Sequence, residues 1–409
     1  MLEWILGLYC LYLLIKLYAA LMEIGFVEKA QRFEPVILSA VNYTKAAAYK
    51  IASQKLLLTT TLYDFILFFA WIGFGLRRLD EIVIFENTLL NSAAYVLVFS
   101  AINYLLTLPF EIYQTFGLDK KFGFSTITPR TFVLDQCKSA VMFVLFGGAF
   151  FAAMVSIIDT FKDWWIYGFV FSFAVVLFIN MIYPIVIVPM FNKLTPLQDE
   201  TLQGAIERLL EKAGLHSSGV FCLDASKRDN RLNAYFGGLG RSKRVVLFDT
   251  LIAKLTTSEL LAVLGHELGH FAHKDILKNI AASALMLLVM FALFGNLPLA
   301  LFESLHVEPS AHAIIALFLL FSPVISFAMM PLFGLMSRYN EYRADAYGSE
   351  CENQEALRDA LMKLADENKS FPFAHPLTIA LYFTHPPLTK RLERLGMHFE
   401  SSTKDACAH

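Results

Sequence analysis

The feature that most constrains this chain is a series of seven long apolar segments. Each is close to the roughly 20 residues that an α-helix needs to cross about 30 Å of hydrocarbon. They cover about residues 2–22, 56–76, 89–110, 139–158, 164–191, 280–302 and 312–336. Hydrophobic residues make up 56% of the 409 residues and charged residues only 17%, whereas about a quarter of the residues in a soluble domain are charged. The sequence therefore predicts a mainly α-helical membrane protein with seven spans.

The positions of the basic residues predict how these segments are oriented. Most lie in the connections after the first and third segments: Lys29, Arg32, Lys45, Lys50, Lys55, Lys120, Lys121, Arg130 and Lys138. The opposite connections hold Arg77, Arg78 and Lys162. Because basic residues gather on the cytoplasmic side of a membrane, we expect the N-terminus outside and the polar segments 194–275 and 337–409 in the cytoplasm. The membrane would be that of the endoplasmic reticulum or a bacterial inner membrane.

The two polar segments divide the chain into four parts. We expect a five-span region at 1–193, the first half of a catalytic domain at 194–275, a membrane hairpin at 276–336 and the second half of the domain at 337–409. Since the hairpin would return the chain to the side on which it started, the two halves can meet at one membrane surface.

The first polar segment has the pattern of a small α+β unit. Apolar residues at helical spacing lie between Leu202 and Ala213, and a short strand is expected at 220–223. Two further strands, at 233–236 and 244–248, flank the Gly-rich turn GGLGRSK and so resemble a hairpin.

The stretch LGHELGHFAHKD contains a His-Glu-x-x-His motif. His266 and His270 are four residues apart, so on a helix both imidazoles project from one face toward a common point. Two such nitrogens form half of a tetrahedral zinc site, and Glu267 lies about 100° further round the helix, where its carboxylate can accept a proton from water. Thr256 and Glu259 form a capping box that starts this helix. The alternative is a pair of surface histidines, which the capped and otherwise apolar helix disfavours.

A catalytic zinc site needs a third protein ligand and an open position for water. The stretch SRYNEYRADAYG, just after the last apolar segment, places Glu341 and Asp345 on one helix face. We expect Glu341 to complete a set of two His and one Glu ligands for one Zn²⁺ per chain, and Asp345 to hydrogen-bond a ligating histidine. The alternative is an exposed acidic helix that pairs with Arg338 and Arg343.

Other kinds of site and partner are disfavoured. The five cysteines are scattered singly without a Cys-x-x-Cys pair, which argues against a thiolate zinc site. His273 lies near the same helix face as the motif, but a fourth protein ligand would close the catalytic position, so we leave it out. The net charge of −2 and the lack of a basic block indicate no nucleic-acid partner.

Four stretches taken together resemble the type I CAAX prenyl protease family: ASKRDNRLNAYFGGLGRSKRVVLFDTLI, ELLAVLGHELGHFAHKDI, SRYNEYRADAYG and YFTHPPLTKRLERL. The resemblance implies seven helices in a barrel around a large intramembrane chamber, which the small zinc domain with the His-Glu-x-x-His motif caps. It also implies that His266, His270 and Glu341 bind zinc and that Glu267 is the general base.

The resemblance extends to three further residues. Asn233 and Ala234 resemble the edge strand along which the substrate backbone pairs. His385, in the stretch THPP, resembles a catalytic residue that stabilises the oxyanion. The alternative for His385 is a structural role in a loop before two prolines, since a lone histidine is a weak signal.

The activity implied is removal of the C-terminal tripeptide from prenylated Cys-a-a-X proteins at the lipid bilayer, with the lipid held in the chamber. Water attacks the scissile carbonyl directly, so no covalent intermediate is expected. One alternative is a quality-control zinc protease of the heat-shock type. Another is a non-enzymatic receptor, transporter or scaffold with seven helices. A protease of the site-2 type is disfavoured because the sequence has no Leu-Asp-Gly motif and a polar domain precedes the zinc motif.

Overall fold

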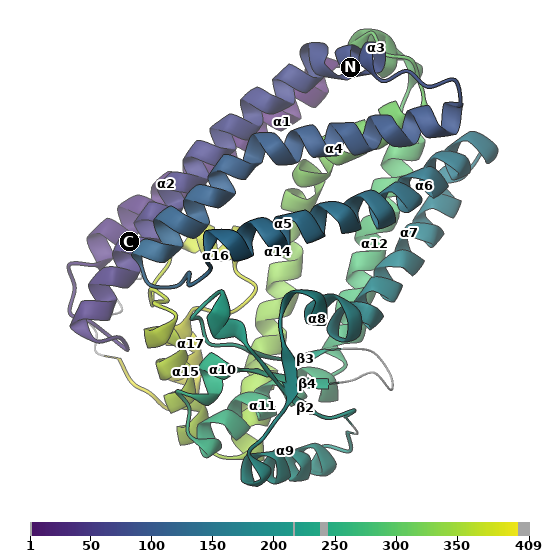
Figure 1. The fold of residues 1–409 in the computed structure, drawn as a ribbon. Helices are drawn as coiled ribbons and strands as arrows, with labels where there is room; N and C mark the ends of the chain where they lie inside the picture. The colour runs from purple at the N-terminus through teal and green to yellow at the C-terminus, as the bar shows by residue number, and fades with distance from the viewer. Residues whose placement is uncertain (1, 216, 238–243, 400–409) are drawn as a thin grey trace.

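The structure, a computed structural model, describes residues 2–215, 217–237 and 244–399. Long helices form the upper part of the molecule and a compact domain of short helices and strands lies below them (Figure 1). Seven helical segments among the described residues are long and apolar enough to cross a membrane. They are Leu2–Ala30, Ala40–Ile82, Thr88–Asp119, Pro129–Thr160, Trp164–Phe191, Asp275–Gly295 and Ala311–Cys351. The prediction of a mainly helical protein with seven spans is confirmed.

Four of the spans combine successive helices, whereas α1 (Leu2–Ala30), α12 (Asp275–Gly295) and α14 (Ala311–Cys351) are each continuous. The second span joins α2 (Ala40–Ala70), η1 (Trp71–Gly75) and α3 (Leu76–Ile82), and the third joins α4 (Thr88–Ile112) and η2 (Tyr113–Asp119). The fourth joins α5 (Pro129–Met142), η3 (Phe143–Gly147) and α6 (Gly148–Thr160), and the fifth joins α7 (Trp164–Ile182), η4 (Tyr183–Ile187) and α8 (Val188–Phe191). The η segments within these spans are wider π-helical turns. In η4 the wider turn includes Pro184, which has no N–H for the regular helical ladder.

The sixth span ends earlier than we expected. The expected segment was 280–302, but α12 ends at Gly295 and a separate helix, α13 (Leu299–Leu305), follows it. Pro298 comes between them and cannot continue a helix, because it lacks an N–H and disfavours helical backbone in the residue before it. The expected end of this span was therefore wrong, since hydropathy alone does not register a proline.

Most of the side chains on the spans are not buried inside the protein. In the most apolar window of each span only 11–22% of the residues are buried inside the protein. Buried aromatic and aliphatic side chains gather at one end, where α3, α4, α6 and α13 meet the start of α14. A packed apolar core therefore closes this end of the bundle.

The lower domain is built on a sheet with strand order β1-β2-β4-β3. The strands are β1 (Leu194–Pro196), β2 (Val220–Leu223), β3 (Ala234–Gly237) and β4 (Arg244–Phe248). β2 and β4 are parallel, and β1 and β3 pair antiparallel with their neighbours. The expected strand pair is present as β3 and β4, but the Gly-rich turn between them, after Gly237, lies outside the described residues.

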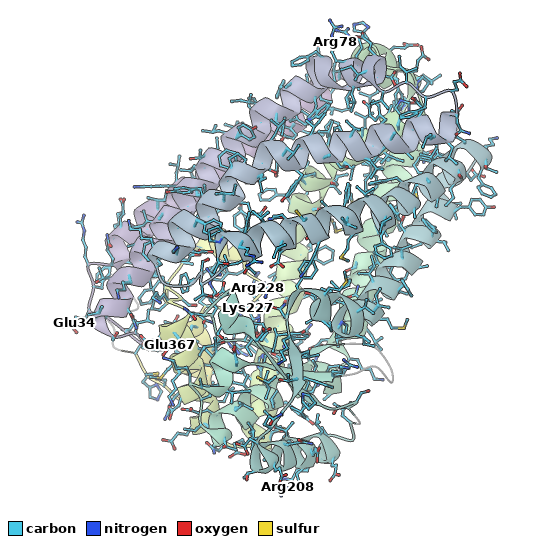
Figure 2. All side chains as sticks on the ribbon, viewed as in Figure 1. Glu34, Arg78, Arg208, Lys227, Arg228 and Glu367 are labelled. Carbon is cyan, nitrogen blue, oxygen red and sulfur yellow. The ribbon has the colours of Figure 1, made fainter. Side chains whose placement is uncertain are left out.

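Short helices complete the domain: α9 (Glu200–Lys212), η5 (Ala225–Lys227), α10 (Asp249–Ile252), α11 (Thr257–Ala272), α15 (Gln354–Glu367), α16 (Pro376–Tyr382) and α17 (Leu388–Arg394). The apolar stripe expected on α9 is buried, and Ile206 packs with Val245 of the sheet and Leu264 of α11 in one core. Figure 2 shows Arg208, on α9, at the opposite end of the molecule from Arg78, on α3. The domain thus covers the end of the bundle that the apolar side chains do not close.

Helix α11 packs closely against the last part of α14, and glycines allow this approach. A Cβ on Gly269 would lie 2.8 Å from the Cα of Ala344, and a Cβ on Gly348 would lie 2.8 Å from the backbone nitrogen of His266. Real Cβ atoms do not approach neighbouring backbone so closely, so a larger residue would push the helices apart. This packing brings the His-Glu-x-x-His helix against the helix that carries Glu341.

The domain is also attached to the membrane helices by an ion pair. Nε of Arg228 lies 2.9 Å from Oδ2 of Asp135, on α5. Figure 2 shows Arg228 between the long helices and the domain. Since both side chains are largely buried, this pair fixes the segment that leads into β3.

Candidate metal centre

Helix α11 presents the first two candidate ligands, and its start is fixed by the expected capping box. The N–H of Thr256 donates to Oε2 of Glu259 at 2.8 Å, and the N–H of Glu259 donates to Oγ1 of Thr256 at 3.3 Å. The helix ends at Ala272, and the ring of the next residue, His273, lies against Tyr347. Among the described residues, the converging group below does not include His273.

His266, His270 and Glu341 come together at one point. Their ligand atoms all lie within 4.8 Å of one another. Nε2 of His266 lies 3.5 Å from Oε2 of Glu341, and Nε2 of His270 lies 3.4 Å from Oε1 of the same carboxylate. Two imidazole nitrogens and one carboxylate are the donor set that a catalytic zinc site uses.

The electrostatics of this group also fit a cation. Oε2 of Glu341 is buried and has no hydrogen-bond partner among the described residues, and such an orphaned acceptor is costly unless a cation or donor meets it. Burial lowers the pKa of His270, but the neighbouring carboxylates of Glu341 and Asp275 outweigh it and raise this pKa to about 9. The site therefore favours a positive charge at its centre.

Each histidine is held from behind by an aspartate. Nδ1 of His266 lies 2.8 Å from Oδ1 of Asp345, and Nδ1 of His270 lies 3.1 Å from Oδ2 of Asp275. A carboxylate can only accept, so each Nδ1 carries a proton, and each Nε2 is the nitrogen that would bind a metal once it is deprotonated. The sequence predicted the contact of Asp345 with a histidine but gave no role to Asp275.

Arg391, on α17, is a second residue that sequence reasoning missed. Its Nε donates to Oδ2 of Asp345 at 2.8 Å and its Nη2 donates to Oδ1 at 2.6 Å, in a bidentate pair that is buried on both sides. Its Nη1 lies 3.6 Å from Oε2 of Glu341. In the sequence, Arg391 stands in the stretch TKRLERL. No helical or strand spacing relates it to Asp345, so no sequence pattern indicated their contact.

Glu267 lies beside the cluster. Burial raises the pKa of its carboxyl above the ordinary value, while His266 and His270 oppose the rise. Within the described part of the chain, its side chain forms no hydrogen bond or ion pair of its own. A carboxylate with a raised pKa and no fixed partner is suited to accept and return a proton near neutral pH.

His385 reaches the same cluster from the loop after α16. Its Nε2 lies 3.3 Å from Oε1 of Glu341, and its Nδ1 lies 3.1 Å from Oγ1 of Thr384. The side chain is 63% exposed. His385 is therefore at the open side of the cluster, where a peptide carbonyl could approach it.

Ala234 is the first residue of β3 and Asn233 immediately precedes it; β3 is one of the two edge strands of the sheet within the described residues. The N–H of Phe248 donates to the carbonyl of Asn233 at 3.1 Å, so residue 233 faces β4. Since residues along a strand alternate, the backbone groups of Ala234 and Phe236 face outward. The ring of Phe236 lies against Phe271, beside His270 on α11. The outward edge of β3 is thus next to the helix that carries the motif.

The side-chain carbonyl of Asn233 is already bonded locally. Its Oδ1 accepts a hydrogen bond at 2.8 Å from the N–H of Ala234. An extended peptide that paired with this edge would have to replace that local bond.

Comparison with known proteins decides the family. The model of Peptidase family M48 matches residues 196–397. CAAX prenyl protease 1 of Saccharomyces cerevisiae is 34% identical over 329 residues, which are 76% of this chain and 73% of the relative. The chain belongs to peptidase family M48. This M48 enzyme is a membrane metalloendopeptidase, as the sequence predicted, and the non-enzymatic alternative is set aside.

The likeness extends through the membrane helices of this M48 peptidase. Residues 29–193 match the family described as CAAX prenyl protease N-terminal, five membrane helices. The CAAX prenyl protease 1 homolog of Oryza sativa subsp. japonica is 32% identical over 88% of each chain, and the uncharacterized metalloprotease YhfN of Bacillus subtilis is 31% identical over 81% of this chain and 80% of its own. The crystal structure of S. mikatae Ste24p matches with a TM-score of 0.86 and 29% identity, over 95% of this chain and 97% of that one. The predicted fold class is confirmed.

Proposed function

We propose that the protein is a zinc-dependent endopeptidase that removes the C-terminal tripeptide of prenylated CAAX proteins. The observation that carries the proposal is the convergence of His266, His270 and Glu341 beside Glu267, at the end of a seven-span bundle. The CAAX prenyl protease names of relatives that share most of the chain's length support the substrate class.

His266, His270 and Glu341 would hold one Zn²⁺ per chain. Two imidazoles and a carboxylate suit zinc better than the harder Mg²⁺ or Ca²⁺, which prefer oxygen ligands. Once bound, the metal would lower the pKa of a water molecule and polarise the scissile carbonyl. Asp345 and Asp275 would fix the tautomers of the two ligating histidines, and Arg391 would hold Asp345 in place.

The side chains around the ligands would perform the proton transfers. Glu267 would accept the proton of the attacking water and then deliver it to the leaving amine. His385, on the exposed side of the cluster, would donate to the carbonyl oxygen as negative charge develops there. Because water attacks directly, inhibitors that modify serine or cysteine nucleophiles should leave the activity intact.

The substrate would lie between the sheet and the bundle. Its backbone would pair with the outward edge of β3 at Asn233 and Ala234, as β-strand addition requires. Its prenyl group would occupy the interior of the bundle. The four parts of the chain would serve this arrangement, with the catalytic halves 194–275 and 337–409 facing the cytoplasm across the hairpin 276–336. The bilayer would be that of the endoplasmic reticulum or a bacterial inner membrane.

The proposal is tested with two peptides of the same sequence, one farnesylated at its Cys-a-a-X cysteine and one unmodified. The purified protein in detergent should release the tripeptide from the farnesylated peptide, as measured by mass spectrometry, and a chelator should abolish release until Zn²⁺ is added back. The Glu267→Ala variant is the inactive control. Equal cleavage of both peptides would contradict the prenyl specificity and favour the quality-control protease.

A further inference from the structure

Arg338 lies on α14 three residues before Glu341, and its guanidinium points at the end of α16. Its Nη1 donates to the carbonyl of Ile379 at 3.0 Å and also to the carbonyl of Phe383. The carbonyl of Ile379 also accepts from the N–H of Phe383 at 3.3 Å, and carbonyls at the C-terminal end of a helix bind cations well. Arg338 therefore ties the end of α16 to the helix that carries a candidate ligand.

The residues that follow this attachment lead directly to His385. Phe383 is two residues before His385, and only Thr384 separates them. Oγ1 of Thr384 and Oε1 of Glu341 lie 3.1 Å and 3.3 Å from the two ring nitrogens of the exposed His385. The position of His385 relative to the ligands thus depends on where the backbone at Phe383 is held.

The start of α16, the helix before this loop, is anchored to the first two spans. The N–H of His375, at the start of α16, donates to Oε2 of the fully buried Glu23 at 2.8 Å. Lys50, on α2, lies 3.4 Å from Oε1 of Glu23, and its ammonium lies 5.4 Å from the centre of the Phe383 ring. Helix α16 is therefore fixed at its start by α1, while Arg338 fixes its end on the side of the metal centre.

Gly334, one turn earlier on α14, leaves the space for this attachment. A Cβ on Gly334 would lie 2.8 Å from Nη1 of Arg338 and 2.9 Å from the carbonyl oxygen of Phe383. The second contact is with backbone, so the loop would have to move away from α14. A substitution here displaces the loop without removing any charge.

We infer that Arg338 is a positioning residue for the reaction: by binding the carbonyls of Ile379 and Phe383, it sets the distance of His385 from the metal centre. The inference rests on the proposed role of His385 in the oxyanion step. Loss of Arg338 should slow turnover without removing the metal, because it touches no ligand atom. A displacement of about 1 Å in a catalytic group is enough to lower a rate by up to about 100-fold.

The test is a double-mutant cycle between Arg338 and His385, with cleavage of one peptide, prenylated or not, as the readout. Arg338→Ala should lower kcat by roughly 10- to 100-fold with a much smaller change in KM. In a His385→Ala background the same substitution should cost less than about 3-fold, because there is no imidazole left to position. Arg338→Lys, which keeps one donor, should recover part of kcat.

Two further variants separate positioning from general damage. Gly334→Ala should lower kcat in the same way as Arg338→Ala, and its effect should also shrink in the His385→Ala background. Arg343→Ala, an Arg substitution on the same helix whose guanidinium lies over the ring of Tyr339, should behave like the wild type. Every variant should retain one metal ion per chain.

The outcomes distinguish the inference from the function on which it rests. If Arg338→Ala costs the same factor with and without His385, Arg338 does not act through His385 and the inference is overturned while the proposed function stands. If His385→Ala is as active as the wild type, the oxyanion role and the inference are both overturned, yet the metal-dependent hydrolysis remains. If the wild type cleaves no peptide, the proposed function itself is contradicted.

Discussion

His270 is held between two carboxylates, one on each side of its ring. Oδ2 of Asp275 lies 3.1 Å from Nδ1, and Oε1 of Glu341 lies 3.4 Å from Nε2. Asp275 is buried and its other oxygen accepts from Lys278 at 2.8 Å. The carboxylate of Asp275 therefore orients the ring, and the carboxylate of Glu341 lies beside Nε2, the nitrogen that would bind the metal.

Substituting Asp275 should weaken metal binding without removing a ligand. Asp275→Ala leaves Nδ1 of His270 without its acceptor, so the ring loses its fixed tautomer and orientation. We expect the affinity for Zn²⁺ to fall about 10- to 100-fold, measured by competition with a chromophoric chelator. Asp275→Asn keeps an acceptor oxygen and should lose less. Unchanged affinity in the Ala variant would show that the contact does not support the site.

Substitutions of Glu341 and Glu267 should have separate effects on metal binding and on hydrolysis. Glu341→Ala removes one of three donor atoms, so the purified variant should contain little metal by atomic emission. Glu267→Ala removes no ligand and should keep about one metal ion per chain, while its cleavage rate falls at least about 100-fold because the proton acceptor is lost. Full metal retention in Glu341→Ala would contradict its assignment as a ligand.

The two candidate ligands on α11 could be predicted from the sequence because their geometry is local. The spacing of His266 and His270 on one helix fixes their directions before any tertiary contact forms. Asp275 is five residues from His270, which is not a neighbouring position on a helix. It reaches the ring because Lys274 adopts a left-handed φ of 57° and the chain turns between α11 and α12. The pattern of the sequence does not predict that turn.

The sequence analysis also missed contacts between distant residues and the end of one helix. Arg391 meets Asp345 across 46 positions of the chain, so their pairing depends on how α17 packs against α14. By contrast, the end of the sixth span could have been predicted, since Pro298 is visible in the sequence and marks the helix break that hydropathy misses. Composition and periodicity predict which segments form helices, but not which side chains meet between them.

Arg391 should be required for the stability of the metal centre. Arg391→Ala leaves the carboxylate of Asp345 buried with His266 as its remaining partner, and breaking a buried ion pair costs about 3–5 kcal/mol. We expect a lower unfolding temperature and weaker metal binding, measured by thermal scanning with and without Zn²⁺. Arg391→Lys should be intermediate, because an ammonium cannot form two parallel bonds to one carboxylate. A wild-type unfolding temperature for Arg391→Ala would rule out this support.

Glu259 should make the stability of α11 depend on pH. Burial raises its pKa, but the bonds from Lys363 and from Thr256 outweigh burial and hold the pKa of Glu259 below its ordinary value of 4.5. A lowered pKa in the folded state means that the carboxylate stabilises the fold above pH 4.5 and that this stabilisation is lost as the pH falls through the lower value. Glu259→Gln keeps an acceptor for the capping box but loses the charge.

The unfolding temperature of Glu259→Gln should therefore be lower than that of the wild type near neutral pH, and the difference should shrink as the pH falls below 4.5. The comparison is made in one detergent across a pH series. Glu211→Gln, which also removes one carboxylate but from an exposed position on α9 of the same domain, controls for the change in charge alone. A difference that stays constant with pH would mean that the ion pair with Lys363 is not its source.

The outward edge of β3 should be required for peptide binding but not for folding. The residue pairs 233–248 and 235–246 face each other across β3 and β4 with their backbone groups bonded, whereas the N–H of Phe236 faces outward. Phe236→Pro removes that outward donor at a position where an edge strand tolerates proline. Tyr235→Pro removes a donor to β4 instead and should destabilise the domain.

Phe236→Ala is the matched control for the loss of the ring against Phe271. Relative to it, Phe236→Pro should raise KM for the peptide roughly 2- to 10-fold, the value of one hydrogen bond, with kcat and metal content nearly unchanged. If the Pro and Ala variants share the same KM while both remain folded, the substrate does not bond to the N–H of residue 236, and strand addition along β3 would have to be abandoned as its mode of binding.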